Sequence, residues 1–109
     1  MSSAYIKRGD RLPTLVIQLT DGGEAFDLTG YTVQLKARDS AGDTVIDAAM
    51  SVVDAAEGTV SYAWQAADTE TAGGLDLEIE ATRTIDSLVR TFPDEGFLSV
   101  VITEDIPAA

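Results

Sequence analysis

Two alternating runs with a turn between them make up residues 58–83, which read GTVSYAWQAADTETAGGLDLEIEATR. Residues 59–64 and residues 75–83 are apolar at nearly every second position. Successive side chains of a β-strand point to opposite faces, so this pattern predicts two half-buried strands that share one apolar face of a pleated ribbon. The inward side chains are Val60, Tyr62, Trp64, Leu75, Leu77, Ile79 and Ala81. Because a single ribbon cannot bury its apolar face alone, another layer of the chain must cover it.

Similar short runs lie on both sides of this stretch. They predict strands near residues 15–19, 33–38, 88–92 and 97–102, each bounded by turns that contain Gly, Asp or Pro. Seven or eight short strands without a long helix are typical of an antiparallel sandwich or small barrel. The sequence therefore predicts an all-β fold, and we expect an immunoglobulin-like antiparallel β-sandwich.

Residues 44–57 fit two structures. Their apolar side chains fall at helical spacing, and Gly58 could cap a helix that ends before it. The β-branched residues at 44–46 and 52–53 favour strands instead, and residues 54–58 resemble a turn. We prefer two short strands, with a bend near Ala48 and Ala49.

The chain has 109 residues, which is enough for one domain with one continuous core. We expect an N-terminal arm or edge segment at residues 1–13, a β-sandwich domain at residues 14–103 and a C-terminal tail at residues 104–109. No apolar run approaches the ~18 residues of a membrane span, and the N-terminus lacks a secretory apolar region. These features predict a soluble protein that is made in the cytoplasm.

Charge and composition argue against several functions. Nineteen acidic and seven basic residues give a formal charge of −12, which opposes binding to nucleic acid and to anionic membranes. The sequence has no cysteine and no histidine, so thiolate metal sites and the commonest catalytic bases are absent. We therefore predict a protein that is not an enzyme, with no catalytic residues, no cofactor and no metal site.

Carboxylates alone could still serve a site. With so many acids, a glycosidase-like pair would arise by chance. Calcium takes such oxygen ligands, and pairs of acids occur in turns such as Asp39 with Asp43 and Asp94 with Glu95. None of these pairs has the spacing of an EF-hand loop, so we interpret them as solvated turns.

Two rows of charged side chains repeat at two-residue spacing. Asp76, Glu78 and Glu80 share one face of a predicted strand, and Gln34, Lys36 and Arg38 share one face of another. If the strands are neighbours, the rows form cross-strand pairs worth a few tenths of a kcal/mol each. Alternatively, the acidic row docks on a basic partner.

Five of the seven basic residues lie within the first 38 positions of the chain. Such an asymmetry could orient a docking surface, although it also suits solubility alone. As candidate partner-binding residues we select Tyr5, Lys7, Arg8 and Arg11 of the N-terminal segment, together with the acidic row Asp76, Glu78 and Glu80.

The aromatic residues have two interpretations. Tyr62 and Trp64 point inward by parity and are expected in the core, and Phe92 and Phe97 are expected to clamp the turn between them. The alternative is a carbohydrate- or host-surface-binding module, in which Trp64, Tyr31 or acidic loop residues form a shallow site. A buried Trp64 would count against this alternative.

Several short motifs resemble a known family in the order in which they occur. They are IKRGD at residues 6–10, LP at 12–13, DLTG at 27–30, VDAAEG at 53–58, YAW at 62–64, DT at 68–69, TAG at 71–73, TFP at 91–93 and GF at 96–97. This set is similar to small structural proteins of tailed phages and prophages, in particular to the N-terminal domain of siphophage baseplate upper proteins.

The resemblance implies an immunoglobulin-like β-sandwich without enzymatic activity or cofactor, which attaches to the virion through its surface. On this basis we expect a structural component of a tailed-phage particle: a tail, baseplate or neck adaptor, or a capsid ornament. Its partners would be other virion proteins, and homo-oligomers are possible.

Overall fold

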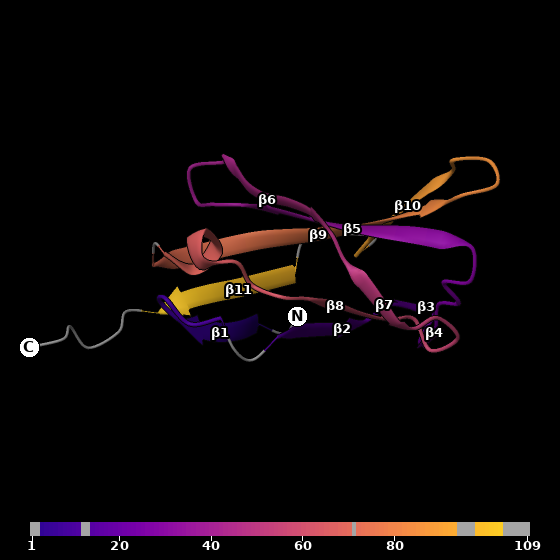
Figure 1. Ribbon diagram of the computed structural model, residues 1–109, viewed down its shortest axis with the longest axis horizontal. Coiled ribbons are helices and arrows are strands. Elements are labelled where there is room, and N and C mark those ends of the chain that lie inside the picture. The colour runs from indigo at the N-terminus through magenta and orange to yellow at the C-terminus, as the bar shows by residue number, and fades with distance from the viewer. Residues whose placement is uncertain (1–2, 12–13, 71, 94–97, 104–109) are drawn as a thin grey trace, which may run out of the picture.

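The computed structural model describes residues 3–11, 14–70, 72–93 and 98–103 (Figure 1). Within these residues the chain forms eleven strands and one short 3₁₀ helix, η1 (Ala66–Thr69). The strands are β1 (Ser3–Lys7), β2 (Leu15–Gln18), β3 (Thr20–Asp21), β4 (Glu24–Ala25), β5 (Tyr31–Arg38), β6 (Thr44–Ala49), β7 (Ser51–Asp54), β8 (Thr59–Tyr62), β9 (Gly73–Arg83), β10 (Val89–Phe92) and β11 (Leu98–Thr103).

The strands form two main sheets and a small hairpin. Six strands make the larger sheet, with the order β1-β11-β9-β5-β6 and with β10 also paired to β9. Three strands make the smaller sheet, in the order β2-β8-β7, and β3 pairs with β4. One cluster of buried apolar side chains takes members from both main sheets. The predicted all-β, sandwich-like fold is thus confirmed, while the immunoglobulin-like topology stays a prediction.

The described residues contain more strands than the expected seven or eight. Eight of the eleven correspond to predicted segments, and the additional three are β1, β3 and β4. β3 and β4 have two residues each and flank Gly22 and Gly23, which adopt φ of 62° and 85°. This tight hairpin is too short to show an alternating pattern.

The ribbon predicted from residues 58–83 is wrong in one respect. Its two strands exist as β8 and β9, but they belong to different sheets. The connection runs through η1, where the Asp68 carboxylate accepts hydrogen bonds from the Tyr62 hydroxyl and the Gln65 amide. Because this turn carries the chain across to the other sheet, the apolar faces of β8 and β9 meet across the core (Figure 1).

Residues 44–54 form strands, so the helical alternative is wrong and the preferred pair of short strands is confirmed. β6 lies in the larger sheet and β7 in the smaller one. The chain changes sheets at Met50, which is buried and donates its amide to the Val33 carbonyl at 2.9 Å. The predicted bend near Ala48 and Ala49 is thus a crossing between layers.

The edge of β9 opposite β5 pairs with two strands, β10 and β11. Phe92 of β10 pairs with Ile79, and Leu98 of β11 pairs with Leu77, so both strands run antiparallel to β9 along one line. Residues 93–97 separate them. Pro93 has no amide hydrogen to donate, which explains why the ladder of β10 ends before it.

Every second residue of β9 from Leu75 to Ala81 is buried. These side chains face those of the smaller sheet, where Val60 is fully buried and Tyr62 is 6% exposed. The strand alternation in the sequence therefore identified the core side chains of β8 and β9 correctly.

Gly58 occupies a position that other residues do not tolerate. Its φ is +68°, and an added Cβ would lie 2.5 Å from the Phe26 carbonyl oxygen and 2.7 Å from the Leu19 carbonyl oxygen. Its own carbonyl accepts the Leu19 amide at 2.8 Å. The turn into β8 therefore depends on close backbone approach as well as on a left-handed conformation.

We predict that Gly58→Ala lowers the free energy of unfolding by about 3 kcal/mol, because strain and steric overlap add. Gly22→Ala is the matched control: its φ is +62° and no atom lies within 4 Å of the added Cβ. It should cost only about 1 kcal/mol. Urea denaturation of both variants measures the difference, and equal losses would show that the contacts around Gly58 are unimportant.

Candidate partner-binding surfaces

The acidic row lies beside the basic row, as the cross-strand prediction requires. β5 and β9 are antiparallel neighbours, with Lys36 opposite Glu78 and Arg38 opposite Asp76. The ion pairs link Lys36 Nζ to Glu80 Oε2 at 3.5 Å and Arg38 Nε to Asp76 Oδ2 at 3.6 Å. The Lys36 pair is diagonal, a geometry that long side chains reach easily.

These pairs change the character of the predicted acidic row. Asp76 and Glu80 each have a cationic neighbour, so the outer face of β5 and β9 carries mixed charge. On the same face, Gln34 donates a hydrogen bond to the Asp47 carboxylate of β6. A role for Asp76, Glu78 and Glu80 in docking stays a prediction, and such a partner would compete with the existing pairs.

The N-terminal candidates begin on the edge strand of the larger sheet. β1 runs parallel to β11, with Tyr5 opposite Val101 and Lys7 opposite Thr103. Ile6 is buried, whereas Tyr5 points outward and is 69% exposed. The register places Tyr5 and Lys7 on the same outer face as the acidic row, but β11 lies between the two groups.

The segment after β1 is tied to the body by several hydrogen bonds. The Arg8 amide donates to the Thr103 carbonyl at 2.8 Å, and the Gly9 amide donates to the Thr69 carbonyl at 2.8 Å. The buried Thr69 hydroxyl donates to the Asp10 carbonyl at 2.9 Å.

Arg11 Nε donates to the Trp64 carbonyl at 2.9 Å. Residues 3–11 therefore line the body of the domain, and the side chains of Lys7, Arg8 and Arg11 are exposed along it.

The aromatic residues that could stack on a sugar pack against other aromatic side chains of the domain. Trp64 is 3% exposed and meets the Tyr62 ring edge to face, at 5.7 Å between centroids. Tyr31 packs in the same manner against Phe26, at 5.4 Å. Trp64 thus lacks the open face on which a sugar ring stacks, so the carbohydrate-binding alternative loses its main residue.

The Tyr62 ring lies in the core, and its hydroxyl donates a hydrogen bond to the Asp68 carboxylate. Burial raises the pKa of its hydroxyl, and the hydrogen bond to the Asp68 carboxylate raises it further because the phenolate would repel that carboxylate. The neutral hydroxyl is therefore the form that stabilises the connection between β8 and η1.

We predict that this hydroxyl makes stability sensitive to alkaline pH. The folded pKa of Tyr62 lies above its unfolded value of about 10, so the contribution is complete below that pH and declines as pH rises toward the folded pKa. Tyr62→Phe should cost about 1 kcal/mol at pH 7 and should flatten the loss of stability as pH rises above about 10. Urea denaturation at several pH values tests this, and parallel pH profiles for the two proteins would contradict it.

An aromatic corner joins the small hairpin to β10. Phe92 meets Phe26 edge to face at 5.1 Å, and the Arg90 guanidinium lies 4.9 Å from the Phe92 ring centroid. Arg90 also pairs with Asp21 at 3.4 Å. The expected clamp between Phe92 and Phe97 involves a residue, Phe97, that lies outside the described residues. Phe26 was not predicted as the partner of Phe92.

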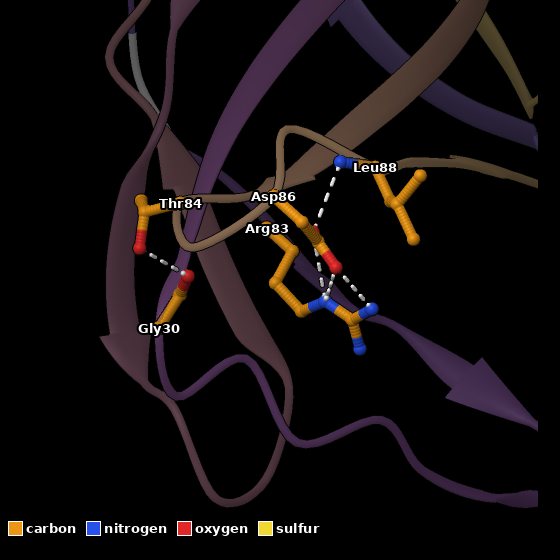
Figure 2. A network of polar contacts seen from close by, with 5 residues as sticks. All are labelled: Gly30, Arg83, Thr84, Asp86 and Leu88. Carbon is orange, nitrogen blue, oxygen red and sulfur yellow. Dashed lines mark hydrogen bonds and ion pairs between the residues drawn. The ribbon is translucent and has the colours of Figure 1, made fainter.

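The loop between β9 and β10 is an ordered structure that the sequence suggested only as a turn (Figure 2). The Asp86 carboxylate accepts hydrogen bonds from Arg83 Nε at 3.0 Å and from its Nη2 at 2.6 Å. The same carboxylate accepts the Leu88 amide at 3.2 Å. At the other side, the Thr84 amide and hydroxyl both donate to the Gly30 carbonyl.

This loop displays apolar side chains to solvent. Ile85 is 88% exposed, Leu88 is 59% exposed and Val89 is 56% exposed. The loop forms the far end of the β9–β10 hairpin, at the opposite end of the molecule from the C-terminal end of β11 (Figure 1). We call residues 84–89 the hairpin tip. The apolar character of these residues was the available signal, but Ile85 was assigned to a turn and Leu88 and Val89 to a returning strand.

The hydrogen bonds from Arg83 lower the pKa of Asp86, because they stabilise the charged carboxylate. These hydrogen bonds weaken when the carboxylate is protonated. We predict that Arg83→Gln raises this pKa toward its ordinary value. Because the pKa of Asp86 is lower in the folded protein than in the unfolded chain, its contacts stabilise the loop fully at pH values above the unfolded pKa. This stabilisation is lost as pH falls through the folded pKa. A carboxyl NMR titration measures the shift, and an unchanged pKa in the variant would contradict the pairing.

Metal binding and membrane spanning can be considered for the part of the chain that the structure covers. Its Asp and Glu side chains form no group of three or more that could hold a metal ion. That part also contains no helix of the length and apolar character needed to cross a membrane. What these residues do present is a set of outer strands, an outer sheet face of mixed charge and an apolar hairpin tip.

These features define the class: a small two-sheet β domain that exposes strand edges and hairpins. The family model described as the BppU N-terminal domain matches residues 3–92 of this chain. The chain therefore belongs to the family of N-terminal domains of phage baseplate upper proteins, and the matched region spans β1 to β10. No curated protein matches the sequence significantly.

Proposed function

We propose that this domain is a non-enzymatic structural component of a tailed-phage virion that acts through contacts with other virion proteins. The observation that carries the proposal is the family match over residues 3–92. The fold supports it, because the outermost strands β1 and β6 of the larger sheet offer edges for further strands or loops.

The charge of the domain favours a different protein over a second copy as the main partner. Two molecules that each carry −12 repel one another, whereas a basic surface would attract the domain. Homo-oligomers remain part of the proposal only where a third protein or local neutralisation brings copies together. The exposed Lys7, Arg8 and Arg11 provide one such basic segment.

A carbohydrate-binding function receives no comparable support, because Trp64 is buried and Tyr31 packs on Phe26.

The test is whether the chain is present in particles. We predict that quantitative mass spectrometry of purified virions, from the phage or induced prophage that encodes the chain, detects it in a fixed ratio to the tail proteins. Host cytosolic proteins of equal abundance serve as the control for contamination. Absence from particles, or a ratio that falls with each purification step, would overturn the structural role.

A second measurement concerns self-association. Light scattering measures the mass of the purified protein at low and at physiological ionic strength. We expect a monomer at low salt, because the mutual repulsion of two acidic bodies is strongest there. A defined oligomer at low salt would show that the acidic charge does not govern association.

A further inference from the structure

The hairpin tip concentrates exposed apolar surface. Among the described residues, eight large apolar side chains are exposed, and three of them, Ile85, Leu88 and Val89, lie within five consecutive positions. Single exposed aliphatic residues are ordinary on protein surfaces, but a cluster at the end of a projecting hairpin is typical of an interaction site.

Hydrogen bonds rather than core packing support the conformation of the tip. The Arg83 amide donates to the Leu88 carbonyl at 2.8 Å, and the Ser87 amide donates to the Arg83 carbonyl at 2.7 Å. Asp86 adds the contacts to Arg83 and Leu88, and Thr84 is fixed to Gly30 (Figure 2). An ordered loop loses little conformational entropy when it binds, so its apolar side chains contribute more of their burial to affinity.

The charge near the tip is locally balanced, unlike that of the whole chain. Asp86 is the one charged residue within residues 84–89, and Arg83 neutralises it. Asp21 is likewise paired with Arg90 on the neighbouring β10. A partner can therefore cover the tip without desolvating an unpaired carboxylate, which would oppose binding elsewhere on this acidic surface.

The size and shape of the tip indicate which partner it fits. A stable interface buries about 800 Å² on each side, which is more than three aliphatic side chains on a convex loop supply. Two such tips could not bury each other, and the charge of −12 further opposes a second copy. Insertion into a concave apolar pocket gives these side chains the largest burial, with the acidic body making the remaining contacts.

From these observations we propose that the hairpin tip is a docking anchor, which inserts Ile85 and Leu88 into an apolar pocket on a different virion protein. The surface around that pocket is basic, to match the acidic body of the domain. The inference rests on the proposed structural function and specifies the surface through which it is performed.

The experiment uses the encoding phage from which the gene for this chain has been deleted. A plasmid supplies the unmodified chain or one of two double variants. Ile85→Ser with Leu88→Ser should reduce the ratio of this chain to tail proteins in purified particles by about tenfold or more. Val16→Ser with Val53→Ser is the matched control, because these valines are 59% and 62% exposed but lie on β2 and β7. The control should be incorporated like the unmodified chain.

Each outcome has a definite meaning. An unmodified chain that is missing from particles overturns the structural function itself. Equal incorporation of the tip variant and the unmodified chain overturns the anchor alone. Equal losses in both double variants would show a general effect of removing exposed aliphatic side chains. This outcome also overturns the anchor. Unchanged thermal unfolding midpoints confirm that the substitutions leave the fold intact.

Two further measurements separate other occupants of the tip. Flotation with phosphatidylcholine vesicles and with vesicles containing phosphatidylserine should recover no protein. Binding that disappears in the tip variant would replace the protein pocket with a membrane. Light scattering should give the same mass for the tip variant and the unmodified chain, and a dimer that the substitutions abolish would identify a second copy as the occupant.

Discussion

Burial of the inner face of β9 is the constraint on which the rest of the structure depends. This strand pairs with β5 along one edge and with both β10 and β11 along the other. Leu75, Leu77, Ile79 and Ala81 supply its inner face, and each is at most 5% exposed. A strand buried on one face needs a second layer, so the chain must leave the larger sheet to build β2, β8 and β7. The connection through η1, the sheet change at Met50 and the close approach at Gly58 are the places where it does so.

The alternation of residues specified which side chains are buried far better than it specified which strands are neighbours. Tyr62 and Leu77 were both assigned correctly to the core, yet β8 and β9 do not pair. Periodicity fixes the face on which a side chain lies, whereas pairing depends on the connection, here a ten-residue segment containing η1. The same reasoning explains why the strands on both sides of Met50 could be predicted while their division between two sheets could not.

The candidate surfaces were predictable to a different degree for each. The basic and acidic rows of β5 and β9 could be matched from parity alone, because residues two apart share a face and antiparallel neighbours bring the rows together. The hairpin tip was not recognised. Because apolar residues are usually buried, Leu88 was assigned to the start of a returning strand, whereas Ile85 was assigned to a turn, and the two were not connected. Only the loop geometry, with Asp86 bound to Arg83, shows that these side chains face solvent.

Charge and apolar surface are separated in this domain. The outer face of the larger sheet carries paired charges that water solvates well, while the tip holds exposed aliphatic side chains beside a neutralised carboxylate. An acidic body keeps free copies apart and soluble, and it attracts basic partners over distances comparable to the screening length of about 10 Å. Apolar contacts act only at close range and carry no such long-range attraction. A domain built in this way can use charge to select and orient a partner, and a small apolar anchor to slow its release.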